Sequence, residues 1–80
     1  MLDHNVFTVK TWTGEIKQVK KIALFPELDN KGELFYKIEG QLNLDHFMIG
    51  YYYDSDKAMQ VFTGLLNDLM EYQVHNLQSI

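Results

Sequence analysis

The stretch "ELFYKIEGQLNLDHFMIGYYY", Glu33 to Tyr53, decides the fold. From Glu33 to Leu44 the residues alternate between an apolar series and a mostly polar one, and from His46 to Tyr53 the alternation is repeated. A period of two is typical of strands that bury one face. The polar letters "NLDH" separate the two runs, so the stretch predicts two antiparallel strands joined by a short turn.

The register of this hairpin follows from matching the two apolar series. The predicted pairs are Leu42 with Phe47, Gly40 with Ile49, Ile38 with Tyr51, and Tyr36 with Tyr53. Both apolar series then fall on one side of the sheet, as a sheet with one buried face requires. This register predicts that Tyr51 and Tyr53 lie in the core and that Tyr52 points to the opposite face.

A second hairpin is predicted upstream, turning at "DNKG", Asp29 to Gly32. These residues suit a type I turn closed by a glycine in the left-handed conformation. The register that follows pairs Leu28 with Leu34, Leu24 with Ile38, and Ile22 with Gly40. Pro26 would face Tyr36. Because proline has no N–H, the Pro26 position belongs on an unpaired edge, so the first strand of the chain should not extend along its neighbour as far as Pro26.

The N-terminal hairpin is predicted to turn at Thr13 and Gly14. Its second strand would continue into the next one, but Val19 and Ile22 lie in opposite phases of the alternation. We therefore expect a bulge or a twist near Lys20 and Lys21.

After Tyr53 the sequence changes to a helical period. Asp54 or Ser55 can cap the helix, and Asp56 suits the positive end of its dipole. One stripe comprises Ala58, Phe62, Leu65, Leu69 and Tyr72, and Met59, Val61, Leu66 and Met70 widen it to about half of the cylinder.

We predict an α+β fold in which a four-stranded antiparallel β-meander is followed by one C-terminal α-helix packed on one face (β-β-β-β-α), with residues 1–80 forming a single domain.

Composition limits the class of protein. The chain has 80 residues, 46% of them hydrophobic, no cysteine and a net charge of −4. These values are typical of one globular domain of the reducing cytosol, so a cytoplasmic location and no membrane association are expected. All seven cations are lysine. Because arginine is preferred for phosphate and guanine contacts, a nucleic-acid partner is unlikely on composition.

Catalytic and metal-binding patterns are weak. His4, His46 and His75 are not spaced as a metal pair, and neither Ser55 nor Ser79 has a partner histidine nearby in sequence. The glycines are scattered and make no phosphate-binding loop. We expect no enzymatic activity, no cofactor and no metal site.

The face of the sheet away from the helix is predicted to be apolar although nothing obvious covers it. Such a patch generally marks an interaction site. The predicted interaction surface comprises Phe25, Phe35, Lys37, Met48 and Tyr52 on this face, with Met59 and Met70 on the helix flank. The function expected is that of a small protein-interaction module that forms a homodimer or binds a protein partner.

Three alternatives remain open for the same face. It could be covered within the monomer by a terminal segment, bind a small molecule, or stack single-stranded nucleic acid on its aromatic rings beside Lys17, Lys21 and Lys37. The predicted strand order resembles that of small β-β-β-β-α single-strand-binding modules that dimerise. That likeness of fold alone implies no function.

Overall fold

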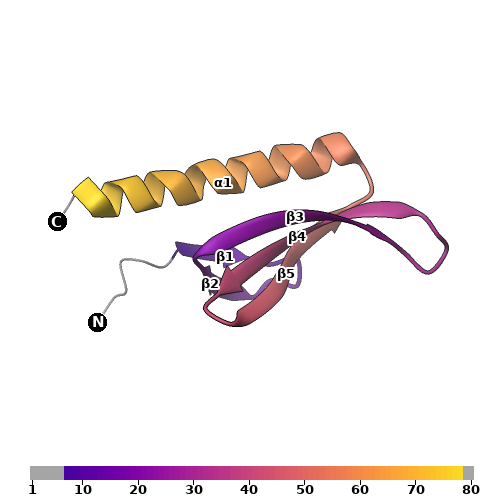
Figure 1. Ribbon diagram of the computed structural model, residues 1–80, viewed down its shortest axis with the longest axis horizontal. Helices are drawn as coiled ribbons and strands as arrows, with labels where there is room; N and C mark the ends of the chain where they lie inside the picture. The colour runs from indigo at the N-terminus through magenta and orange to yellow at the C-terminus, as the bar shows by residue number, and fades with distance from the viewer. Residues whose placement is uncertain (1–6, 79–80) are drawn as a thin grey trace.

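The structure is a computed structural model that describes residues 7–78, with side chains as far as residue 73. Five strands precede one helix (Figure 1): β1 (Phe7–Lys10), β2 (Ile16–Val19), β3 (Lys21–Leu28), β4 (Leu34–Leu42), β5 (Asp45–Tyr52) and α1 (Ser55–Gln78). The strands form two antiparallel sheets, β1-β2 and β3-β4-β5. The predicted α+β class is therefore confirmed. The four-stranded meander is corrected in one detail, because the strand before Pro26 is interrupted at Lys20 and divides into β2 and β3.

The β3-β4 hairpin has the predicted register. Leu28 pairs with Leu34, Leu24 with Ile38, and Ile22 with Gly40. Gly32 has a φ of 81°, in the left-handed region that suits glycine, and its N–H donates to the Asp29 carbonyl at 3.0 Å. The Asp29 side chain accepts the N–H groups of Lys31 and Glu33 at 2.8 Å each, which fixes the turn.

The predicted register of the β4-β5 hairpin is wrong. The turn contains only Asn43 and Leu44, with Asn43 at a φ of 57°, and Leu42 pairs with Asp45 rather than with Phe47. Gly40 therefore pairs with Phe47. Two-residue hairpin turns favour residues that tolerate positive φ at this position, and asparagine is among them.

A β-bulge then changes the phase of β5. Glu39 pairs with Met48 and Ile38 with Gly50, so Ile49 is the extra residue. Beyond the bulge Tyr52 pairs with Tyr36 and lies against the core. Tyr51, which pairs with Lys37, and the following Tyr53 lie on the opposite face and are 42% and 52% exposed. The predicted positions of the three tyrosines are thus exchanged.

The β1-β2 hairpin turns at Thr13 and Gly14 as predicted, and it packs on the three-stranded sheet. The Trp12 N–H donates to the Ile49 carbonyl at 2.7 Å, and the Lys20 N–H donates to the Gln41 carbonyl at 2.8 Å. The fully buried Val19 side chain lies against Gly40. The irregularity expected near Lys20 is the break between the two sheets.

Helix α1 starts where the sequence predicts, with Asp54 as its cap. The Asp54 carboxylate accepts the N–H groups of Asp56 and Lys57 at 2.9 and 3.3 Å. Ala58 and Leu69 are buried on the side of the helix that faces the strands. Its partly buried Val61, Phe62 and Leu65 pack against a core of Val9, Val19, Ile38 and Ile49.

The molecule is elongated, with extents of 49 × 22 × 20 Å. Helix α1 runs along one side of the strands, and the β3-β4 turn lies at the opposite end of the sheet from the β4-β5 turn (Figure 1). An elongated molecule of this size has little interior, which leaves large apolar side chains exposed.

Candidate functional site

The outer sheet face, defined as the side of β3-β4-β5 away from α1, is the candidate site. Alternation along the paired strands assigns its members. They are Lys21, Ala23, Phe25 and Glu27 of β3; Phe35, Lys37, Glu39 and Gln41 of β4; and His46, Met48, Tyr51 and the adjoining Tyr53 of β5. The face is therefore partly aromatic and partly charged.

Four rings form a connected aromatic cluster on this face, comprising Trp12, Phe35, Tyr51 and Tyr53. The Tyr51 ring meets the Trp12 ring edge-on at a centroid distance of 5.4 Å and the Phe35 ring at 6.0 Å. The Tyr53 ring lies 5.7 Å from Phe35 and 6.4 Å from Tyr51. Trp12 is 56% exposed. Such edge-to-face contacts hold the rings in place while their faces remain accessible.

A pocket of about 390 Å³ opens beside this cluster at the β3-β4 turn. Its aromatic wall is formed by Phe35, Tyr51 and Tyr53, and Asp29 supplies a carboxylate. The Tyr53 hydroxyl donates to Asp29 Oδ2 at 2.9 Å. Backbone donation from Glu33, together with this phenol, lowers the pKa of Asp29, and the Asp29 carboxylate raises the pKa of Tyr53. The pocket is therefore aromatic and anionic at neutral pH.

A row of acidic and basic side chains crosses the same face. Lys37 Nζ lies 2.8 Å from Glu27 Oε1 and 4.0 Å from Glu39 Oε2, and His46 Nδ1 lies 3.0 Å from Glu39 Oε1. The hydrogen bond to Glu27 raises the pKa of Lys37, and the contact with His46 lowers the pKa of Glu39. The positive charge of Lys37 is thus matched within the chain.

The structure brings together four of the seven predicted interaction residues. Phe25, Phe35, Lys37 and Met48 share the outer sheet face. Tyr52 does not, because the bulge turns it toward the core. Met59 and Met70, each 54% exposed, lie on the helix, apart from this face.

Sequence reasoning missed three members of the aromatic cluster. The alternation places Tyr51 and Tyr53 in the core, and it gives no signal for Trp12. The small residue at Gly50 next to an apolar Ile49 is compatible with a bulge, but alternation gives no phase when three tyrosines are consecutive. Trp12 reaches Tyr51 only because the hairpin loop bonds to Ile49.

Both edges of the three-stranded sheet carry features that oppose the addition of another strand. β3 contains Pro26, which cannot donate to a neighbouring strand. β5 contains the bulge at Ile49, whose carbonyl is already bonded by Trp12. Bulges and prolines are common protection of open edges. The faces of the sheet therefore offer more for association than its edges.

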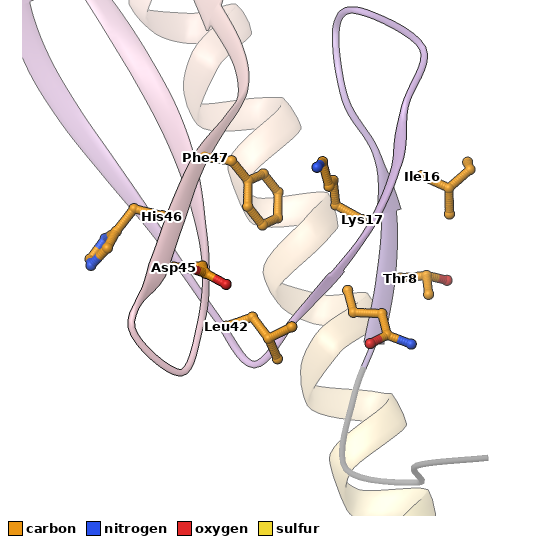
Figure 2. Close-up of a pocket in the computed structure, with 8 residues that line it drawn as sticks. Thr8, Ile16, Lys17, Leu42, Asp45, His46 and Phe47 are labelled. Atoms are coloured by element: carbon orange, nitrogen blue, oxygen red, sulfur yellow. The ribbon is translucent and has the colours of Figure 1, made fainter. Parts of the chain in front are cut away.

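A second hollow, of about 650 Å³, lies between the β1-β2 hairpin and the start of β5 (Figure 2). Figure 2 shows the Phe47 ring and Lys17 pointing toward one another across it, whereas His46 points away. The Lys17 ammonium lies 5.9 Å from the centroid of Phe47 and 3.5 Å from Glu15 Oε2. This cation already has two partners in the chain, so the hollow shows no arrangement for a particular ligand.

Metal binding and membrane crossing concern the described residues, 7–78 with side chains as far as residue 73. In this part of the chain no group of three or more His, Asp or Glu side chains could hold a metal ion. No helix there is both long and apolar enough to cross a membrane. His4, the side chain of His75 and Ser79 lie outside the described residues, so the predictions for them are not assessed.

Comparison with known proteins gives no relative. No family model matches the chain, and no curated protein or solved structure matches it. Function is therefore inferred from the geometry of the outer sheet face.

Proposed function

We propose that this protein is a small, non-enzymatic, cytoplasmic protein-interaction module that forms a homodimer through its outer sheet face. The observation that carries the proposal is the aromatic cluster, in which Trp12, Tyr51 and Tyr53 are about half exposed although the Tyr51 ring contacts both of the others. Tyrosine and tryptophan in such positions are the residues that contribute most to protein interfaces.

The exposed area supports a partner of about the same size. The chain exposes 5983 Å². A compact monomer of 9.4 kDa is expected to expose roughly 5,000 Å², so the excess is about 1,000 Å². Each subunit of a standard interface buries about 800 Å². The excess is of the size that one subunit buries in such an interface, and the elongated shape of the chain, 49 × 22 × 20 Å, contributes to it.

The protected edges favour packing through the face. A dimer formed by adding β3 to β3 of a second copy would place Pro26 where a donor is needed. Face-to-face packing keeps the edges free and places the aromatic cluster of each copy in the interface. Lys37 enters such an interface with its ammonium already 2.8 Å from the Glu27 carboxylate, which limits the cost of burying its charge.

The test is the concentration dependence of the molar mass, measured by light scattering and sedimentation. We expect a dimer for the wild type and a monomer for Tyr51→Glu and Phe35→Glu, because each change buries a carboxylate among aromatic rings. Circular dichroism checks that the variants fold. Met70→Glu is the matched control: it places the same charge on the exposed helix flank and should leave the dimer intact. A wild type that stays monomeric at high concentration removes the proposal, and a monomeric Met70→Glu moves the interface to the helix.

Single-stranded nucleic acid is the second candidate for the same face, because exposed rings on an open sheet can stack bases. The matched charge of Lys37 and the net charge of −4 count against it. Quenching of Trp12 fluorescence by single-stranded DNA at low salt, fading as salt rises, would favour this candidate. No quenching at low salt would eliminate it.

A further inference from the structure

We infer that the two copies pack with their strands antiparallel, so that Lys21 of each copy enters the pocket beside Asp29 of the other. This inference rests on the proposed homodimer and specifies its arrangement. It starts from the distribution of charge along the outer sheet face, which differs at the two ends.

One end of the face is cationic. Lys21 is the first residue of β3 and pairs with Gln41, at the end of the sheet that carries the β4-β5 turn (Figure 1). Its alternation with Ala23 and Phe25 places it on the outer sheet face. Lys21 is exposed and forms no ion pair with any residue that the structure describes. Its ammonium is therefore available to a partner.

The other end is aromatic and anionic. There the Asp29 carboxylate lies in the pocket formed with Phe35, Tyr51 and Tyr53, and none of the residues lining this pocket is a lysine. The three ring centroids lie 5.7 to 6.4 Å from one another, with their planes steeply inclined. An ammonium group is attracted both to the faces of such rings and to a carboxylate. The chemistry of the pocket thus fits a lysine side chain.

The spacing along β3 matches the two ends. Consider a twofold axis that lies in the interface, runs across the strands and passes through Phe25. It places the residue four positions before Phe25 in one copy opposite the residue four positions after Phe25 in the other copy. Lys21 is then opposite Asp29 in the second copy, and by symmetry the reverse contact also forms. Phe25, which is 39% exposed, packs against its own counterpart at the axis.

The alternative twofold axis, parallel to the strands and lying over β3, would bring like ends together. Lys21 would approach Lys21, and Asp29 would approach Asp29. Like charges placed opposite each other are unfavourable and help to exclude a wrong arrangement. The Lys21–Asp29 contacts form only in the antiparallel packing. The axis of that packing runs along the row of Phe25, Lys37 and Tyr51, so the Lys37 side chains of the two copies meet at it, each with its ammonium 2.8 Å from the Glu27 carboxylate of its own chain.

A zero-length carbodiimide cross-link on the wild-type protein tests the contact directly. Equal amounts of ¹⁵N-labelled and unlabelled chains are mixed, and cross-linked peptides are identified by mass. We expect an amide between Lys21 of one chain and Asp29 of the other. The Lys37–Glu27 pair, at 2.8 Å, is an internal positive control that should link within one chain. A dimer that links Lys37 to Glu27 but never Lys21 to Asp29 would overturn the arrangement.

A pair of adjacent charge reversals gives a quantitative test. Lys21→Glu should weaken the dimer roughly tenfold to hundredfold, because two symmetric contacts, each an ion pair with cation–π character, are lost. Lys20→Glu makes the same change one residue away, between the two sheets, and should have a much smaller effect. Added salt should reduce the difference in dimer affinity between Lys21→Glu and Lys20→Glu.

The outcomes separate this inference from the proposal beneath it. A wild type without a dimer refutes the homodimer itself. A stable dimer in which Lys21→Glu and Lys20→Glu weaken association equally refutes only the antiparallel arrangement. Circular dichroism of both variants confirms that they are folded when they are compared.

Discussion

Replacing Gly40 with alanine tests how the β1-β2 hairpin packs on the three-stranded sheet. A β-carbon at position 40 would lie 2.7 Å from Val19 Cγ1 and 2.8 and 2.9 Å from two atoms of the Phe47 ring. These distances are well below van der Waals contact between carbon atoms, which is about 3.5–4.0 Å. Val19 is fully buried, so its side chain has no free space into which to move. The added methyl group must therefore displace the hairpin or the ring.

The expected cost follows from this geometry. Overpacking a filled core typically costs about 1–3 kcal/mol. Against this, replacing glycine in a strand reduces the entropy of the unfolded chain and returns about 0.5–1 kcal/mol. The net destabilisation should be roughly 1–2 kcal/mol, which for a domain of this size lowers the melting temperature by about 5–15 °C.

Urea and thermal unfolding followed by circular dichroism measure the effect. Gly64→Ala is the matched control, because a β-carbon at this exposed helical position meets nothing within 4 Å. Alanine should stabilise the helix there by about 0.5–1 kcal/mol. The same substitution thus has opposite signs at the two sites. A Gly40→Ala variant as stable as the wild type would refute the packing of Val19 and Phe47 over the sheet.

Three further predictions concern turns, an edge and pH. Asn43→Val should destabilise the fold by about 1–2 kcal/mol, because a branched side chain is strained at the φ of 57°, whereas Asn43→Gly should be close to neutral in thermal unfolding. Pro26→Val should restore a donor on the open edge of β3 and increase turbidity on prolonged standing, with little change in melting temperature. Folding lowers the pKa of Asp29 below its ordinary value of 3.8, so its contribution is complete above that value and is lost as the pH falls through the lower folded pKa. Asp29→Asn should therefore be less stable than the wild type at neutral pH, and its urea midpoint should fall less steeply below pH 3.8. A fall as steep as that of the wild type would contradict the lowered pKa of Asp29.

Much of the fold could be predicted from the sequence because local signals and the alternation agree. The hydrogen bonds of the turn from Asp29 to Gly32 are those that its residue types favour. The apolar series on both sides of the turn allow one register only. The start of the helix is similar, since Asp54 is a good cap in front of a helical period. The opposite phases of Val19 and Ile22 indicate an irregularity at Lys20. Alternation alone does not show that this irregularity divides the strands into two sheets.

The end of β5 could not be predicted by the same reasoning. Tyr51, Tyr52 and Tyr53 are equally suited to the core and to an interface, so either phase gives a plausible pattern. The two-residue turn at Asn43 moves the pairing by two residues, which keeps the phase, and the bulge at Ile49 alone reverses the faces of the three tyrosines. The identity of the rings on the outer sheet face depends on that reversal, whereas Phe25, Phe35 and Lys37 are placed correctly because they belong to the hairpin whose register is fixed.

The bulge at Ile49 also has an evolutionary consequence. Loss of a single codon at this position would rotate the last residues of the strand by one step, exchanging two outward phenol rings for one while leaving the composition almost unchanged. Because Ile49 is also a buried core residue, such a deletion would exchange the rings of the outer sheet face and at the same time remove part of the hydrophobic interior. Length variation at this site, more than substitution, therefore determines which rings the outer sheet face presents.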